Sequence, residues 1–165
     1  MVVAERAVGK LDYDKADIWL VTETEYERDR LNSCAKEPET VQWIEQYVKP
    51  GDTFYDIGAN IGAYSLIADA QGAIVYAFEP VPSTFAHLAR NVTENKARIW
   101  LIPLGVMDRP GIDVLALSSE EAGAASHRWH SREGLGTLTT TLDGAVNAFT
   151  LALSLIHISE PTRPY

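Results

Sequence analysis

The sequence predicts an α/β fold of the doubly wound type, in which helices cover a mostly parallel β-sheet. Three segments, 53–57, 73–78 and 98–104, are short and almost continuously apolar, as expected of strands buried on both faces. Segments with helical spacing alternate with them. This β-α-β-α-β order requires parallel strands joined by right-handed crossovers.

Local signals define the elements before the sheet. Residues 17–22 are rich in aromatic and β-branched side chains and predict a short strand, whereas the acid-rich residues 22–30 suit a loop or a helical turn. Pro38 fits the first position of a helix that ends at the turn 49–52. The apolar positions of this helix recur at three and four residues and are Val41, Ile44, Tyr47 and Val48.

Two further helices connect the predicted strands. The first covers 63–70, which holds good helix formers, and Gly72 is suited to its C-terminal cap. The second follows Ser83 as the expected N-cap, and its apolar positions are Phe85, Leu88, Ala89 and Val92. Beyond the third strand we expect a turn at 108–111, an antiparallel strand at 112–117, a loop at 120–136 and a strand at 137–142.

Composition and charge narrow the classes of function. The 165 residues allow one domain with a substantial core, and 46% apolar with 22% charged residues is an ordinary globular composition. Twenty-three acidic against 14 basic side chains give a net charge of −9 with no basic cluster, which argues against a nucleic-acid partner. No segment approaches the length of a membrane span. Because Cys34 is the only cysteine, we expect a cytoplasmic protein.

A glycine-containing turn and a carboxylate lie where a nucleoside cofactor would bind. Ligands of open parallel sheets bind beyond the carboxyl ends of the strands. The first predicted strand ends in Asp56-Ile57-Gly58-Ala59-Asn60-Ile61-Gly62, and Glu79 ends the second strand. Gly58 leaves room for a ligand against the backbone, and Gly62 lets the helix start close to the strand. Asn60 tolerates left-handed conformations. A carboxylate at position 79 can accept hydrogen bonds from both ribose hydroxyls.

The spacing of the glycines argues against a dinucleotide. The G-x-G-x-x-G fingerprint, started at Gly58, requires glycine at positions where the sequence has Asn60 and Ala63. A ligand without pyrophosphate fits this loop better. Two other interpretations remain: an oxidoreductase with a dinucleotide cofactor, and an interaction module that keeps the fold and binds no cofactor.

The segment 56–65, with Phe78-Glu79-Pro80 and the spaced Leu88, Asn91 and Asn95, closely resembles the FkbM family of methyltransferases. The similarity covers roughly residues 25–146 and includes 49–52, 104–111 and 140–143. The resemblance implies a Rossmann-like methyltransferase fold, S-adenosylmethionine as the cofactor, and the hydroxyl of a small molecule or sugar as the methyl acceptor.

The resemblance also assigns roles to individual residues. It implies that the glycines and Asn60 contact the methionine part of the cofactor, that Asp56 orients the loop or reaches the amino group, and that Glu79 binds the ribose. Leu104 is expected to border the adenine. The residues expected to bind the cofactor are Asp56, Gly58, Ala59, Asn60, Gly62, Glu79 and Pro80.

The resemblance ends before the family's fourth strand and its Asp-rich end, where residues facing the acceptor would lie. The catalytic residues are therefore unknown, and we expect an N-terminal fragment, truncated after about the third parallel strand plus an antiparallel appendage and inactive by itself. The predicted organisation is an N-terminal strand and helix cap at 1–50, a partial cofactor-binding domain at 51–150 and a non-native tail at 151–165. Residues 153–165 resemble the translation of a sequencing-library adapter, the alternative being a natural C-terminal strand followed by a Pro-rich end. No function is assigned to His157 or Arg163.

Several other side chains receive structural interpretations. His127 and His130 have an H-x-x-H spacing without a nearby cysteine, so surface histidines are favoured over a metal site. Cys34 is expected to be a partly buried residue and not a nucleophile. His87 is expected to face solvent. Packing in the core or in a hairpin is expected for Trp19, Trp43 and Trp100.

Overall fold

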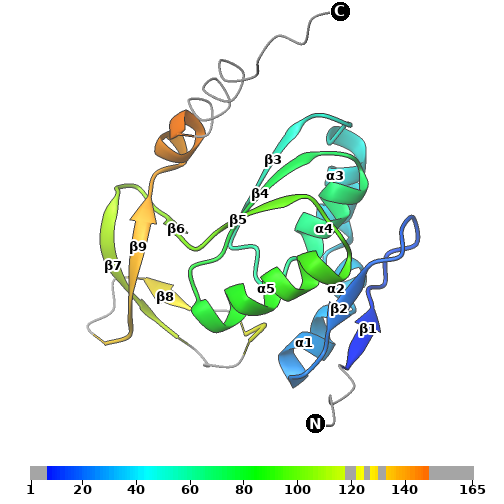
Figure 1. Cartoon of the computed structure of the whole chain (residues 1–165), viewed down its shortest axis with the longest axis horizontal. Coiled ribbons are helices and arrows are strands. Elements are labelled where there is room, and N and C mark those ends of the chain that lie inside the picture. Colours follow the sequence, from blue (N-terminus) through cyan, green and yellow to red (C-terminus); the bar gives the residue numbers. More distant parts are fainter. Residues whose placement is uncertain (1–6, 118–121, 125–126, 130–132, 149–165) are drawn as a thin grey trace, which may run out of the picture.

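Figure 1 shows the chain as a computed structural model, which describes residues 7–117, 122–124, 127–129 and 133–148. His130 and the predicted tail at 151–165 lie outside the described residues. The strands form an N-terminal hairpin, a central parallel sheet and a second mixed sheet. In Figure 1 the hairpin and the mixed sheet lie on opposite sides of α5.

The central sheet is parallel throughout. Its strands are β3 (Thr53–Ile57), β4 (Ile74–Phe78) and β5 (Ile99–Ile102), in the order β3-β4-β5. Helices α4 (Ala63–Ala70) and α5 (Pro82–Glu94) form the two crossovers. This β-α-β-α-β unit is one half of a doubly wound, Rossmann-like fold. The predicted α/β class is confirmed.

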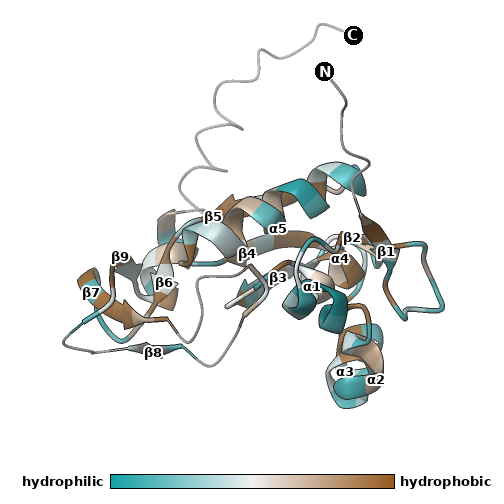
Figure 2. Cartoon of the chain, turned by 90° about the horizontal axis from the view of Figure 1, so that it is seen from below, coloured by the Kyte–Doolittle hydropathy of each residue, from teal (hydrophilic) through white to brown (hydrophobic). Residues whose placement is uncertain are grey.

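Both crossover helices cover the same face of this sheet. Val75 of β4 packs in a cluster with Leu66 of α4, and Ala77 of β4 packs in a cluster with Leu88 of α5. Because side chains two residues apart on a strand point to the same face, α4 and α5 lie side by side on it. Figure 2 shows apolar residues gathered on α4 and the sheet, whereas α1 is hydrophilic.

The other face of the sheet carries a row of aromatic rings. Tyr55, Tyr76 and Trp100 stack across the three strands with centroids 5.3 and 6.1 Å apart. Trp100 is 53% exposed and Trp43, on the outer side of its helix, is 52% exposed, so core packing was a wrong prediction for both. Residues 142–148 are helical, and Ala145 packs against Tyr76.

The N-terminal segment forms more structure than its sequence indicates. Strands β1 (Val8–Lys10) and β2 (Trp19–Val21) pair as an antiparallel hairpin, and Trp19 lies in it. Helices α1 (Glu25–Arg30), α2 (Ser33–Lys36) and α3 (Pro38–Tyr47) follow. Within the segment 22–30, a helix begins at Glu25 because Thr24 and Glu27 form a reciprocal capping box at its start. The hairpin lies beside α5 through β2 (Figure 1).

The predicted antiparallel appendage is a separate mixed sheet. Its strands β6 (Gly105–Val106), β9 (Leu135–Thr140), β7 (Gly111–Ala116) and β8 (Arg128–Trp129) lie in the order β6-β9-β7-β8. Strand β7 is antiparallel to β8 and β9, and β6 is parallel to β9. The expected loop at 120–136 was only partly right, because it contains β8 and the buried residues 122–124.

The start of α5 differs from the prediction by two residues. The N-cap is Val81 and not Ser83, and Pro82 occupies the first turn. Proline lacks an N–H and has a helical φ, so Pro82 begins the helix before Ser83 is reached. Among the described residues, no helix has the length and apolar character that crossing a membrane requires.

Candidate functional site

The motif between β3 and α4 forms a tight loop at the carboxyl end of the sheet. Gly58, Asn60 and Gly62 all have left-handed backbone conformations, with φ of 79°, 52° and 94°. The N–H groups of Gly58 and Ala59 both donate to Phe78 O at 2.9 Å. The loop is therefore fixed to the end of β4, where Glu79 follows.

The two glycines Gly58 and Gly62 of the loop have different surroundings. A Cβ added at Gly58 would meet no atom within 4 Å, so this side of the loop is open to a ligand. A Cβ at Gly62 would lie 2.5 Å from Leu88 Cδ1 on α5. The close approach at Gly62 is therefore to the second crossover helix, which the sequence alone did not predict.

The Glu79 carboxylate holds the loop and the start of α5 together. Its Oε2 accepts from Asn60 N at 2.9 Å, and its Oε1 accepts from Val81 N at 2.8 Å. Glu79 is 5% exposed. Burial raises the pKa of this carboxyl group, although the two N–H donors act in the opposite direction. A carboxylate offers about four acceptor positions, so two bonds leave capacity for ribose hydroxyls.

Asp56 lies at the end of β3, beneath the loop. Its Oδ2 accepts from Ser65 Oγ, in the first turns of α4, at 2.6 Å. Burial raises the pKa of Asp56, and the bonds from Ser65 oppose that effect. The charge of Asp56 also raises the pKa of Glu79. The two predicted acids are thus close enough to influence one another.

Asn60 uses its side chain inside the protein. Its Oδ1 accepts from Ile61 N at 2.8 Å, and its Nδ2 donates to Ala124 O at 2.9 Å and to Gly123 O at 3.3 Å. The buried segment 122–124 therefore lies against the loop, a contact that has no signal in the sequence. Asn60 stays a predicted cofactor contact.

Two cavities lie near the carboxyl end of the sheet, and the glycine loop lines the first of them. One, of about 290 Å³, lies between residues 56–64 and the N-terminal helices. The other, of about 430 Å³, lies beyond β4 and β5 and is lined by Phe78, Leu104, Ala145 and neighbouring residues. Glu79 directly follows Phe78 in the chain and lines neither cavity. The first cavity is lined by charged and polar side chains as well as apolar ones, whereas the second is mostly apolar.

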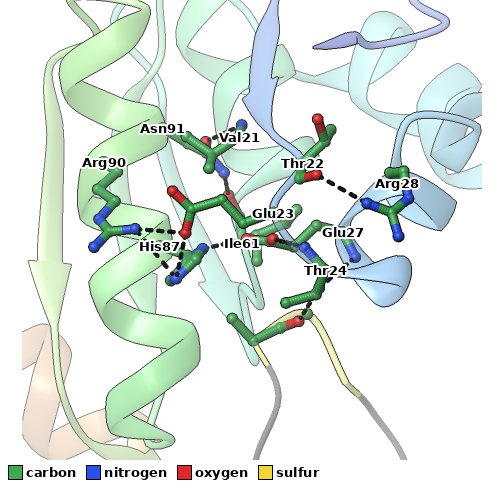
Figure 3. Close-up of polar contacts among 12 residues, drawn as sticks. Val21, Thr22, Glu23, Thr24, Glu27, Arg28, Ile61, His87, Arg90 and Asn91 are labelled. Carbon is green, nitrogen blue, oxygen red and sulfur yellow. Dashed lines mark hydrogen bonds and ion pairs between the residues drawn. The ribbon is translucent and has the colours of Figure 1, made fainter. Parts of the chain in front are cut away.

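The N-terminal segment is tied to α5 by buried polar groups (Figure 3). Asn91 accepts from Val21 N at 2.8 Å and donates to Ile61 O at 2.8 Å, so one side chain joins β2 to the loop. Glu27 is fully buried, and its carboxylate contacts His87 Nδ1 and accepts from Thr24 N.

His87 therefore does not face solvent, which corrects the sequence-based expectation. Its side chain is 13% exposed, and its Nε2 lies 3.7 Å from Glu23 Oε2. Arg90 Nη1 donates to the same Glu23 oxygen at 3.0 Å. The pattern i, i+3, i+4 of His87, Arg90 and Asn91 on α5 was a usable signal, because it places three polar side chains on one helix face.

The remaining residues singled out from the sequence have the following surroundings in the structure. Pro80 is half-buried between Glu79 and the first turn of α5. Burial raises the pKa of Cys34 to about 12, and Asp12 adds to the shift, so the thiol is a poor nucleophile at neutral pH. Burial lowers the pKa of His127. Among the described residues, no group of three or more His, Cys, Asp or Glu side chains is placed to hold a metal ion.

Comparison with known proteins identifies the relatives of this chain. No protein-family model matches it. The chain is 37% identical over 67 residues to 31-O-demethyl-FK506 methyltransferase FkbM of Streptomyces tacrolimicus, covering 39% of this chain and 26% of that protein. It is 31% identical over 113 residues to hexuronic acid methyltransferase AglP of Haloferax volcanii, covering 67% and 45%. The chain is a homologue of these methyltransferases.

The resemblance to FkbM-type methyltransferases is thereby confirmed. The chain spans about a quarter of the length of FkbM and somewhat under half of the length of AglP. Two solved structures are also similar. One is an S-adenosylmethionine-dependent methyltransferase from Agrobacterium tumefaciens, which is 16% identical, covers 58% of this chain and 32% of its own, and has a TM-score of 0.44. The other is TYW2 from P. horikoshii in complex with MeSAdo, which is 26% identical, covers 64% of this chain and 39% of its own, and has a TM-score of 0.44.

Proposed function

We propose that this chain carries the S-adenosylmethionine-binding site of a methyltransferase. The observation that carries the proposal is the contact between Glu79 Oε2 and Asn60 N at 2.9 Å. It joins the carboxylate that ends the second strand to the glycine loop that ends the first. The open space at Gly58 fits a ligand lying against the loop backbone. The cofactor, when bound, supplies an electrophilic methyl group on a sulfonium centre.

We propose that the three parts of the cofactor bind at three parts of the site. We assign the methionine part to the polar cavity beside Gly58, the ribose to Glu79, and the adenine to the apolar cavity beside Leu104. Asp56, Ala59, Gly62 and Pro80 complete the proposed binding set. Since Glu79 is buried, ribose binding requires a local opening at the end of β4.

We propose that the methyl acceptor is the hydroxyl of a small molecule or sugar. The names of the two relatives, an O-demethyl-FK506 and a hexuronic acid methyltransferase, support this class. The net charge of −9 disfavours a nucleic-acid acceptor. Holding donor and acceptor in line is the main contribution of a protein to such a displacement. The single Cys34 supports a cytoplasmic location.

Calorimetric titration tests the cofactor class. We expect the purified chain to bind S-adenosylhomocysteine and to show no heat of binding with NADH. Glu79→Ala should abolish binding of S-adenosylhomocysteine. Glu39→Ala, which removes an exposed acid on α3, is the matched control and should leave it unchanged. Binding of NADH in preference would favour the oxidoreductase interpretation, and binding of neither ligand would favour the non-catalytic module.

A further inference from the structure

The cavity beside the glycine loop has a second wall made by the N-terminal helices. Residues 56–61 form one side of it. Arg30, Ser33 and Glu37 form the opposite side, together with Tyr64 of α4. The second wall therefore comes mainly from α1, α2 and the residue after α2. This part of the chain belongs neither to the glycine motif nor to the end of β4, where Glu79 lies.

This wall brings opposite charges to the cavity. Arg30 Nε and Nη2 donate to Gly123 O at 3.3 and 3.1 Å. Within the described part of the chain, its remaining N–H groups have no hydrogen-bond acceptor. Burial, followed by the negative charge of Glu37, raises the pKa of Tyr64, whereas the positive charge of Arg30 lowers it. Both charged groups therefore act on the same cavity side chain.

The position of Arg30 is fixed by the contacts that hold α1 against α5. Glu27, almost one turn before Arg30 on α1, contacts His87 of α5. Asn91 of the same helix binds Ile61 O in the loop (Figure 3). Arg30 is thus held relative to the loop by α5 and by its own bonds to Gly123. A cation placed in this way is preorganised, which limits the entropy lost on binding an anion.

We propose that Arg30 binds the α-carboxylate of the amino-acid end of S-adenosylmethionine and makes the site selective for adenosyl ligands that carry that end. The inference rests on the proposed function and adds the N-terminal helices to the cofactor site. A guanidinium and a carboxylate form charge-assisted hydrogen bonds, often in pairs. Glu37 and Asp56 line the same cavity and supply negative charge for the α-ammonium group.

Two ligands that differ at the amino-acid end test this inference. S-adenosylhomocysteine carries the amino-acid group, and 5′-methylthioadenosine lacks it. Calorimetry of the full chain should give tighter binding of S-adenosylhomocysteine. Arg30→Gln should weaken that binding about tenfold to a hundredfold, the range for a hydrogen bond to a charged group. Its affinity for 5′-methylthioadenosine should change less than about twofold, within the spread of distant surface substitutions.

Two further variants separate recognition from folding. Arg28→Gln removes the same charge from the same helix at a residue that does not line the cavity, and should leave both affinities unchanged. Arg30→Lys keeps the charge without the planar fork and should restore part of the lost affinity. An equal loss for both ligands in Arg30→Gln, or no loss for either, would overturn the inference and leave the cofactor class intact. If neither adenosyl ligand binds the unaltered chain, the proposed function fails as well.

Discussion

Gly62→Ala is the substitution whose effect the structure defines most fully. At φ +94° a residue with a Cβ is strained, and left-handed backbone costs about 1–2 kcal/mol for residues other than glycine. The new Cβ would also lie 2.5 Å from Leu88 Cδ1. Leu88 is fully buried, and overpacking of a core costs about 1–3 kcal/mol. Together the two effects predict a loss of about 2–5 kcal/mol in the free energy of unfolding.

Gly58→Ala is the matched control for this prediction. Its backbone is also left-handed, at φ +79°, and its Cβ would meet no atom within 4 Å. It should therefore cost only the backbone strain, about 1–2 kcal/mol. Urea unfolding followed by circular dichroism measures both losses.

The Leu88→Ala background separates strain from contact. In that background Gly62→Ala should cost about 1–2 kcal/mol, because only the backbone strain remains. The difference from its cost in the unaltered chain gives the coupling between Gly62 and Leu88. Equal costs for the Gly58 and Gly62 substitutions, or a coupling near zero, would show that the loop does not pack against α5 as described.

Four other predictions concern the buried polar groups. His87→Ala should lower the free energy of unfolding by about 3 kcal/mol, because the buried Glu27 carboxylate then keeps only its bond from Thr24 N. Adding Glu27→Gln should recover part of this loss in a urea double-mutant cycle, and additive losses would contradict the pairing. Asn91→Ala should cost about 2–4 kcal/mol, because two buried backbone groups lose their partner, and a urea midpoint shift near zero would refute this. Burial raises the pKa of Asp56, so the folded state binds the proton of this carboxyl group more tightly than the unfolded state does. The free energy of unfolding should therefore fall as the pH rises from the ordinary pKa of Asp through the raised pKa. Asp56→Asn should remove that pH dependence in a series of urea unfolding measurements. Because the pKa of Glu79 is also raised, calorimetric affinity for S-adenosylhomocysteine should weaken on acidification at a higher pH than an ordinary glutamate would give, and a flat profile would argue against an ionised ribose-binding carboxylate.

The sequence predicted the elements whose signals are local. The bounds of β3 and α4 agree with the predicted 53–57 and 63–70, because a buried strand, a glycine loop and a run of helix formers each have their own pattern. The left-handed conformation expected at Asn60 is present. The proximity of Glu79 to the loop follows from parallel pairing, since the carboxyl ends of neighbouring parallel strands meet at one edge.

Contacts between distant segments were not predictable in the same way. The bond from Asn60 to Ala124 spans 64 residues, and the contact between Glu27 and His87 spans 60. Neither contact produces a periodic pattern in the sequence. Residues 120–136 are polar and small, which is typical of an exposed loop. The exposure of Trp100 was missed for a related reason: an apolar strand pattern does not say which face of the sheet another element covers.

The most direct test of the account is an amide NMR titration of the 15N-labelled chain with S-adenosylhomocysteine. We predict that the largest shifts fall on the backbone N–H groups of Gly58, Ala59 and Asn60 and on that of Val81, which binds the Glu79 carboxylate. Amides of the exposed outer side of α3, such as that of Trp43, should not move. Saturable shifts confined to other parts of the chain, with the loop amides unchanged, would contradict the placement of the cofactor at this loop.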